Sequence, residues 1–406
     1  MRIRIAIIGI LSVSHCLLYS AEPLKVSLDC KNCDKDYIFR SVPYVEFVRD
    51  QGLSDVHIWS TTVGSGSGGR IYKFNFMGKG KYNSINYELS YQTDPVMSNR
   101  ERQEGIIKTI KSGLLPFMIN NSGFNDVDIV YKTNKIIGNE SIKKDPWNYW
   151  VIEMGGDFDL EKEQSRNELT IEAELEINHT SENWRVRNDL EYEFETEELS
   201  DGDYSFNSAL SNILYEASVV RSISNHWSAG IFTSIWSNSK NNTRFGRRLA
   251  FAVEYNYFPY NQSHKKELSF AYRIGPELLD YYNPTIYDVT SDRLVSNELT
   301  VLFRLEKSWG DLDLVLKGSN YLNDIKKNRL ELESDVQVRI VKGLSLKIGA
   351  EYKVIHDQIY LPKGDIALEE LLLRRKAIET SYIFNLNIGI TYTFGSIYNT
   401  IVNTRL

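Results

Sequence analysis

The sequence has little of several things that would point elsewhere. Among its 406 residues there are three cysteines and nine prolines. Outside the extreme N-terminus, no stretch reaches the roughly 18 consecutive apolar residues of a helical membrane span. A basic excess is also missing, since the net charge is -7. The chain therefore offers no basic face for nucleic acid, and scarce proline together with 25 tyrosines suits long strands with aromatic girdles.

The N-terminus has the pattern of a secretory signal peptide. A short basic region at residues 1–4 precedes an apolar run at residues 5–13, and the small residues Ser20 and Ala21 follow. The run is too short to anchor the chain by spanning a membrane. We therefore expect residues 1–21 to be a signal peptide and the mature chain to be exported.

The cysteines predict neither a metal site nor a cofactor. Cys16 could be a lipidation site, but the bulky His15 precedes it where such sites prefer a small residue. Cys30 and Cys33 have C-x-x-C spacing without a second ligand pair. In an oxidising periplasm this favours a local disulfide over a redox site.

Residues 22–135 have the pattern of a small periplasmic α/β domain. The predicted strands are residues 24–28, 56–63, 71–76, 86–91 and 127–130, and the predicted helices are residues 37–48 and 98–114. Two helices can bury one face of such a sheet. The glycine-rich residues 64–69 lead into a strand, so we interpret them as a hairpin tip and not as a phosphate loop. A polar linker is expected at residues 136–148.

From residue 149 to residue 395 the apolar pattern has a period of two. In residues 344–354, for example, apolar side chains alternate with serine, lysine, glycine and glutamate. Such runs are near the roughly 9 to 11 residues that a tilted strand needs to cross a bilayer. We count about twelve of them, an even number as in bacterial barrels. The predicted fold class is thus mainly β: an antiparallel transmembrane β-barrel of about 12 strands, preceded by the small α/β periplasmic domain.

The polar positions of these strands would line the barrel lumen. The predicted lumen-lining residues are Glu172, Glu174, Glu176, Asp189, Glu191, Glu193, Arg304, Arg339, Lys347, Glu351 and Lys353. Their charges could form salt bridges that fill a closed lumen, or they could line a narrow aqueous pore. The sequence leaves both alternatives open.

The predicted connections alternate in length. Tight turns are expected at residues 179–183, 222–226, 308–310 and 341–343, with longer loops at 196–203, 238–244, 277–294 and 361–380. Short periplasmic turns and longer outer loops would place both ends of the barrel in the periplasm. Helical spacing at residues 366–376 ends in Arg374, Arg375 and Lys376, which could meet lipopolysaccharide phosphates or fold back on the rim.

The last strand resembles the signal that the barrel-assembly machinery reads. Asn387, Gly389, Tyr392 and Phe394 match its pattern of a polar residue, a glycine and two aromatic residues. The departure from the pattern is the tail at residues 396–406, expected in the periplasm. The resemblance implies the assembly machinery as a partner.

The mature chain also resembles a family of uncharacterised bacterial outer-membrane β-barrel proteins. The resemblance rests on the Cys30–Cys33 segment and on residues 37–38, 47–50, 55–57, 68–69, 145–150, 226–228, 343–346 and 391–396. It implies the cell outer membrane of a Gram-negative bacterium as the location, with the N-terminal domain in the periplasm, and it implies no activity.

The sequence favours a non-enzymatic function. We expect a narrow solute channel or an envelope scaffold, contacting outer-membrane lipid and lipopolysaccharide, whose N-terminal domain binds a periplasmic protein partner or plugs the pore. The rival is an enzyme at the outer rim with His356 and Asp357, whereas His226 near Ser228 would fall in a periplasmic turn. A secreted β-protein outside the membrane is the third alternative.

Overall fold

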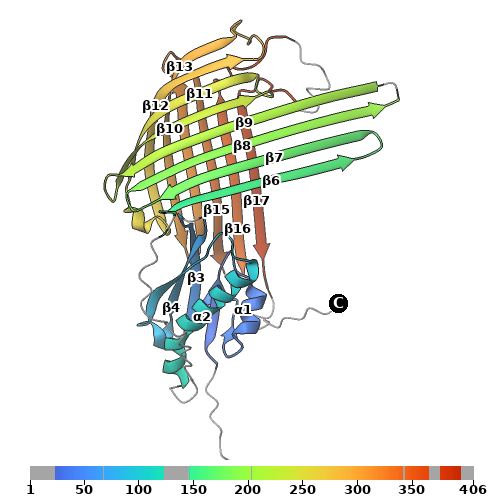
Figure 1. Cartoon of the computed structure of the whole chain (residues 1–406). Helices are drawn as coiled ribbons and strands as arrows, with labels where there is room; N and C mark the ends of the chain where they lie inside the picture. The colour runs from blue at the N-terminus through green and yellow to red at the C-terminus, as the bar shows by residue number, and fades with distance from the viewer. Residues whose placement is uncertain are drawn as a thin grey trace, which may run out of the picture.

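A computed structural model describes residues 23–66, 68–122, 145, 147–202, 204–341, 343–364 and 375–394. Within them the chain forms an α/β unit, which we call the N-terminal unit, and a much larger β-sheet (Figure 1). The predicted signal peptide and C-terminal tail, and most of the predicted linker, lie outside the described residues.

The N-terminal unit has a five-stranded sheet in the order β2-β1-β3-β4-β5. Its elements are β1 (Lys25–Asp29), α1 (Lys35–Ser41), β2 (Glu46–Phe47), β3 (Val56–Gly64), β4 (Arg70–Gly78), β5 (Asn86–Gln92) and α2 (Asn99–Ser122), with 3-10 turns at Gln51–Leu53 and Gly80–Tyr82. β1 runs parallel to β2 and β3, and the other neighbours are antiparallel. The helix predicted over residues 37–48 was wrong at its end, because residues 46–47 pair with β1. The strand predicted at residues 127–130 lies outside the described residues.

Local sequence fixes where both helices of this unit begin. Asp34 accepts a hydrogen bond from the backbone N–H of Tyr37 at 2.9 Å and so caps α1. Ser98 and Glu101 form a capping box at the start of α2, with the Ser98 N–H donating to Glu101 Oε2 at 2.9 Å. The helix predicted from Ser98 onward is thereby confirmed.

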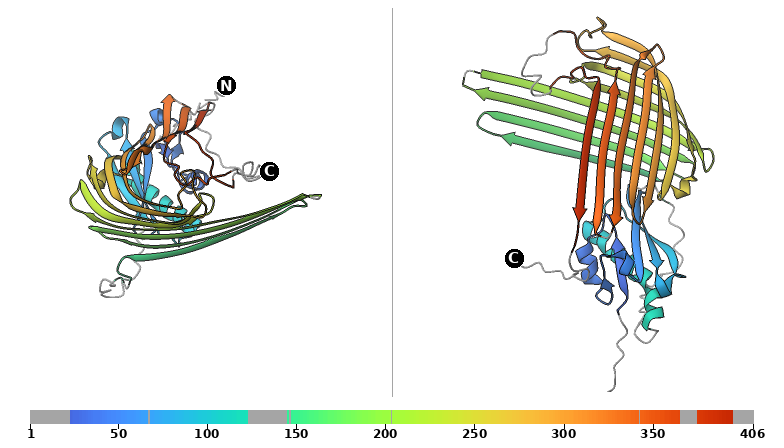
Figure 2. Two further views of the ribbon diagram at one scale, coloured as in Figure 1. Left: turned by 90° about the horizontal axis from the view of Figure 1, so that it is seen from above. Right: turned by 180° about the vertical axis from the view of Figure 1, so that it is seen from behind.

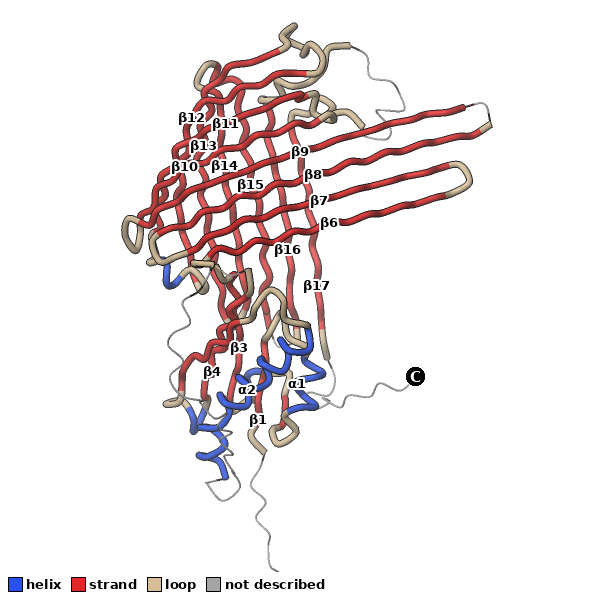
Figure 3. The backbone as a smooth tube through the Cα atoms, viewed as in Figure 1, coloured by secondary structure: helices blue, strands red, loops and turns tan. Residues whose placement is uncertain are grey.

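One face of the five-stranded sheet packs against α1 and α2. Phe74 and Phe76 of β4 are fully buried with Ile110 and Phe117 of α2. The other face carries polar residues, among them His57 of β3. The N-terminal unit lies at one end of the large sheet (Figure 3), and its second face stays exposed along β5.

The large sheet has twelve antiparallel strands in strictly sequential order, as the sequence predicts. They are β6 (Trp150–Lys162), β7 (Arg166–Thr180), β8 (Trp184–Asp201), β9 (Tyr204–Ser222), β10 (Trp227–Asn238), β11 (Thr243–Asn256), β12 (Lys266–Tyr281), β13 (Ser291–Lys307), β14 (Gly310–Tyr321), β15 (Asp324–Val341), β16 (Leu344–Ile355) and β17 (Tyr382–Tyr392). A 3-10 turn at Tyr260–Gln262 lies between β11 and β12. The mainly β fold class is therefore confirmed.

The sheet is strongly curved and its two edges are β6 and β17. Seen from above, β6–β9 extend past the rest of the sheet (Figure 2). Within the described residues β6 pairs only with β7 and β17 only with β16, so the ring is open in this structure. β8 and β9 have 18 and 19 residues, about twice the roughly 9 to 11 that cross a bilayer.

The connections follow the predicted alternation only in part. At the end next to the N-terminal unit, the near end, tight turns join β7 to β8, β9 to β10, β13 to β14 and β15 to β16. At the far end the connections at residues 282–290 and 356–381 are long. The loop predicted at residues 196–203 was wrong, because β8 and β9 stay paired in register as far as Asp201 and Tyr204. The helix predicted at residues 366–376 lies mostly outside the described residues.

No helix among the described residues is both long and apolar enough to cross a membrane.

Candidate functional site

The strand register sorts the side chains of the large sheet onto two faces of opposite chemistry. Successive side chains of a strand point to opposite faces, and paired residues share a face. Glu172 pairs with Glu193, and Arg304 pairs with Asp313. Followed through every pairing, the register places all eleven predicted lumen residues on one face, which we call the charged face.

The opposite face, which we call the apolar face, exposes large hydrophobic side chains on eleven of the twelve strands, and those of β7 are half-buried. Met154 is 77% exposed and Phe158 is 68% exposed on β6, and Phe384 and Ile388 are similarly exposed on β17. Proteins that stay in water rarely expose a continuous apolar surface of this extent. The apolar face therefore requires a covering, for which lipid is suited.

The charged face is acidic along β6, β7 and β8. Asp157, Glu172 and Glu193 form a row of paired positions across three strands, and Glu174 lies beside Glu191 in the next row. A hollow of about 250 Å³ opens over these carboxylates. Mutual repulsion of closely spaced carboxylates favours occupation of this wall by cations.

Farther round the sheet, the charged face carries compensating ion pairs. Arg304 donates to Asp313 at 2.7 Å, and Lys353 lies 2.5 Å from Glu351. Glu298 has both Arg273 and Lys317 within 3.7 Å. Here ion pairs between neighbouring strands and within β16 cover part of the face.

The connection between β16 and β17 folds inward over the far end of the charged face. Ile359 is 1% exposed and packs with Leu279 and Leu294, both on the charged face. Its neighbour Tyr360 accepts a hydrogen bond from Asn242 Nδ2 through its backbone oxygen at 3.1 Å. This loop therefore caps that end with apolar contacts.

Arg375 fastens the same connection to the acidic strand β8. It lies 2.6 Å from Glu195 and donates from Nε to Glu197 at 3.0 Å, and it is 5% exposed. Although burial acts to lower it, the hydrogen bonds and charges of Glu197 and Glu195 raise the pKa of Arg375. The sequence left two alternatives for the cluster that contains Arg375: contact with lipopolysaccharide phosphates, or folding back on the barrel rim. Arg375 folds back onto the large sheet.

At the near end, the N-terminal unit contacts charged-face residues directly. Arg339 Nη2 of β15 donates to Asp29 Oδ1 and Oδ2 of β1 at 2.9 and 3.0 Å. Lys31 Nζ lies 2.7 Å from Asp311 Oδ1 of β14. Since Arg339 and Asp311 both belong to the charged face, the N-terminal unit covers that face where it reaches the near end.

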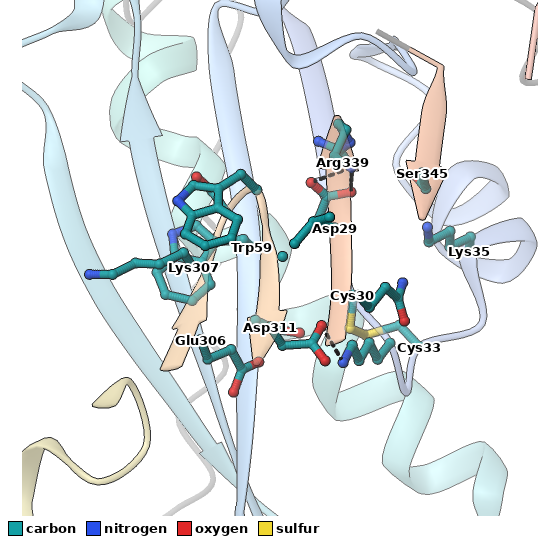
Figure 4. A pocket seen from close by; sticks show the side chains of 17 residues that line it. Asp29, Cys30, Cys33, Lys35, Trp59, Glu306, Lys307, Asp311, Arg339 and Ser345 are labelled. Atoms are coloured by element: carbon teal, nitrogen blue, oxygen red, sulfur yellow. Dashed lines mark hydrogen bonds and ion pairs between the residues drawn. A yellow bond between two sulfur atoms is a disulfide. The ribbon is translucent and has the colours of Figure 1, made fainter. Parts of the chain in front are cut away.

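A pocket of about 410 Å³ lies in this junction, between β1 and β3 of the N-terminal unit and the β13–β16 turns (Figure 4). Cys30 and Cys33, joined by a disulfide, line it together with Trp59. The disulfide holds the β1–α1 turn that carries Lys31.

A second contact joins β5 to the turn between β11 and β12. Lys265 donates to Glu88 Oε2 at 2.7 Å, and Lys73 Nζ lies 3.3 Å from His264 Nδ1. Although partial burial acts to raise it, the hydrogen bond and charge of Lys265 lower the pKa of Glu88. Burial, followed by the charge of Lys73, lowers the pKa of His264.

The glycine-rich hairpin tip forms a third contact. A Cβ on Gly66 would lie 2.6 Å from Thr180 Cβ at the end of β7, and a Cβ on Gly68 would lie 3.6 Å from Val151 of β6. The predicted hairpin is confirmed. Its glycines also allow the hairpin backbone to lie close to the large sheet. The sequence gives no signal of this partner.

His57 is buried beside two residues of β1. Its Nδ1 lies 2.8 Å from Ser27 Oγ, and its Nε2 lies 3.6 Å from Asp29 Oδ2. Burial lowers the pKa of His57 to about 4, with the charges of Lys79 and Arg339 adding to the effect and Asp29 opposing it. Ser27 is buried and donates to Ser54 Oγ at 2.9 Å, so its hydroxyl does not face a substrate. His57 therefore has a structural contact with Ser27, and its Nε2 has no hydrogen-bond partner within the described residues.

The other histidines considered in the sequence have structural contacts. His226 Nδ1 lies 2.7 Å from the backbone oxygen of Asn256, in a near-end turn as predicted. His356 Nδ1 lies 3.1 Å from Asn328 Oδ1, and its neighbour Asp357 binds Arg329 at 3.0 Å. No cluster of three or more metal-ligand side chains occurs within the described part of the chain.

The residues of the predicted assembly signal divide between the two faces of β17. Asn387 and Gly389 lie on the charged face, opposite Gly349 and Lys347. Tyr392 and Phe394 belong to the apolar face and are 61% and 79% exposed. Whether this strand is read by an assembly machinery stays a prediction.

Comparisons with known proteins assign the chain to no family. No protein-family model matches the chain, and no curated protein sequence matches it. A solved structure of the NanC porin is similar over 60% of this chain and 99% of that chain, with 10% sequence identity and a TM-score of 0.28. A likeness this slight supports no inference about function.

Proposed function

We propose that the protein is a narrow outer-membrane channel that is closed at rest. The observation that carries this proposal is the separation of the two faces over twelve consecutive strands, with hydrophobic side chains exposed on one face and charged residues on the other. A sheet of this kind satisfies both lipid and water when it closes on itself. The charged face would then enclose the lumen.

Closure requires β6 and β17 to pair, and the register restricts how they can do so. Odd-numbered residues of both strands lie on the charged face, so odd positions must pair with odd positions. Trp150 begins β6 and Tyr392 ends β17 at the near end, which suits an antiparallel pairing with Met154 beside Ile388.

Cysteine crosslinking in the native membrane tests this closure. Met154→Cys with Ile388→Cys should form a disulfide on oxidation, and the neighbouring partners Leu386→Cys and Ile390→Cys cover a shift of register. The matched control is Met154→Cys with Asn387→Cys, because these two side chains point to opposite faces of the large sheet. Absence of crosslinking at all three apolar-face pairs would show that the two edges do not meet.

The two ends of the charged face support a channel that is closed at rest. The N-terminal unit covers the near end through Arg339 and Asp311, and the connection carrying Ile359 covers the far end. We place the near end and the N-terminal unit in the periplasm, because both ends of the large sheet lie there and the longest connection, residues 356–381, lies at the far end. In this arrangement the N-terminal unit acts as a plug, and a periplasmic protein partner would release it.

Planar-bilayer recording tests the channel. Wild-type protein should show rare, small conductance steps, and the variant Arg339→Gln with Lys265→Gln, which weakens the near-end contacts, should open more often. Lys353→Gln, which removes a cation from an ion pair distant from this junction, is the control. If neither wild type nor the weakened variant conducts, the protein is not a channel.

A further inference from the structure

The charged face has a third hollow, of about 360 Å³, at the near end of β8–β12. Its chemistry is the reverse of the acidic wall beside it. Arg185, Arg187 and Arg273 line it, and Glu254 is the one carboxylate among the lining residues. We call this hollow the arginine niche.

The niche exists because three adjacent strands carry small or short side chains in one row. The register runs from Arg185 through Val220, Gly230 and Ala252 to Arg273, one residue from each of β8 to β12. Neighbouring strands lie about 4.8 Å apart, so the two arginine backbones are about 19 Å apart along a curved sheet. The small central side chains leave a floor between two guanidinium groups.

The charges of the niche are only partly compensated. Within the described residues, Arg185 and Arg187 form no ion pair, and Arg273 reaches Glu298 at 3.7 Å. Glu254 accepts a hydrogen bond from the Tyr260 hydroxyl at 3.0 Å. The niche thus keeps a positive charge excess inside a face that is otherwise largely acidic or paired.

An aromatic ring lies beside these charges. The Arg273 guanidinium is 4.3 Å from the centre of the Phe232 ring, which also lines the niche. This cation–π contact restricts the position of the guanidinium, whose N–H groups can still donate hydrogen bonds. Phe232 and the Gly230–Ala252 floor offer an apolar surface for a short carbon skeleton.

We propose that the arginine niche binds a small organic anion carrying one or more carboxylates. A guanidinium offers paired N–H donors that match both oxygens of a carboxylate. Arg185 and Arg187 would hold one carboxylate, with the carbon skeleton lying across the floor toward Arg273. The volume suits a short-chain acid. This inference names the solute class of the channel proposed above and rests on that proposal for how the solute arrives.

Calorimetry on the full-length protein folded in detergent tests the binding directly. The probes are acetate, glutarate and citrate, with glutaramide as the neutral analogue of glutarate. We expect at least one acid to bind at low ionic strength and glutaramide to bind at least tenfold more weakly. Failure of all three acids, or equal binding of glutarate and glutaramide, would overturn the proposal.

Two variants with different effects on the niche locate the site. Arg185→Gln with Arg187→Gln should weaken acid binding about tenfold or more, because charge-assisted hydrogen bonds are lost. Ala252→Leu should weaken it by filling the floor while all charges remain. Lys347→Gln, which removes one exposed charged-face cation outside the niche, should leave binding within about twofold of wild type. Heat-modifiable gel migration confirms folding of each variant, and equal losses in the control and the double variant would contradict a local site.

The binding and channel experiments fail separately. Acid binding without conductance in any variant would keep the niche and remove the channel. Conductance without acid binding would keep the channel and remove the niche.

Discussion

Arg339 of β15 and Asp29 of β1 lie 310 positions apart in the sequence and meet through two hydrogen bonds of 2.9 and 3.0 Å. Each side chain is about one-third exposed, at 30% and 31%. Asp29 is also the neighbour of the buried His57. The pair therefore links the charged face of the large sheet to the interior of the N-terminal unit.

Weakening the near-end contacts together should loosen the docking of the N-terminal unit. One partly exposed ion pair contributes about 1 kcal/mol or less, so Arg339→Gln alone should have a small effect. The triple variant Lys31→Gln, Lys265→Gln, Arg339→Gln should raise hydrogen exchange in peptides that cover β3, since that strand faces the junction. Lys353→Gln should not. Unchanged exchange in the triple variant would mean that the hairpin tip and apolar contacts alone hold the two parts together.

Loss of Arg375 should release the far-end loop. Its side chain is 6% exposed and that of Glu197 is 3% exposed, but Glu197 also pairs with Arg166 at 2.9 Å, so Arg375→Gln removes one of the two cations that Glu197 contacts. We therefore expect a cost of about 1 to 3 kcal/mol. We expect a lower unfolding midpoint in denaturant and faster hydrogen exchange at residues 375–381.

A double-mutant cycle separates the ion pair from other effects of that substitution. Glu195→Gln added to Arg375→Gln should recover part of the lost stability, because one unpaired carboxylate is removed. Lys363 lies on the same connection as Arg375 and forms an exposed ion pair with Asp288. Lys363→Gln, which breaks this pair, should change stability by less than about 0.5 kcal/mol. No recovery in the cycle would contradict the electrostatic explanation.

His57 should make the N-terminal unit sensitive to acid. Its pKa is lowered from 6.5 to about 4 in the folded state, so the unfolded chain binds a proton more readily between these values. Stability from the neutral, buried histidine is thus complete above about pH 6.5 and is lost as the pH falls toward 4, by up to about 3 kcal/mol. Asp29, Lys79 and Arg339 are the charged groups facing the ring.

Nuclear magnetic resonance of the His57 ring in the full chain measures this directly. A titration midpoint near 4 is expected, and one near 6.5 would contradict the burial. His57→Gln should flatten the dependence of unfolding on pH between 6.5 and 4, whereas the exposed His356→Gln should leave it unchanged.

Much of the fold follows from local patterns. The period-two alternation fixes which side chains share a face, so the strand number and the two faces of the large sheet could be predicted. The helix start at Ser98 has an equally local cause in its capping box. By contrast, the chain after Ser41 leaves the helix because Glu46 and Phe47 find a partner in β1, a pairing that short-range spacing does not encode.

The site was less predictable because its contacts are long-range. Arg339 was predicted to line a lumen, but nothing in its neighbourhood indicates Asp29 as its partner. Likewise, the arginine niche depends on small residues from several strands falling in one row. Such a row appears only once the register between neighbouring strands is known.

The disulfide between Cys30 and Cys33 should contribute modestly to stability and more clearly to docking. The two cysteines are three positions apart, and closing so short a loop is worth about 2 kcal/mol in the chain-entropy model. Cys30 lies in the core of the N-terminal unit, while the turn between the cysteines carries Lys31 to Asp311. Cys30→Ala with Cys33→Ala should therefore lower the unfolding free energy by about 2 kcal/mol and increase exchange in the β1–α1 turn. A reductant should reproduce both effects in wild type and add nothing in the variant. If reduction leaves stability and exchange unchanged, the disulfide neither stabilises the unit nor holds Lys31 at the junction.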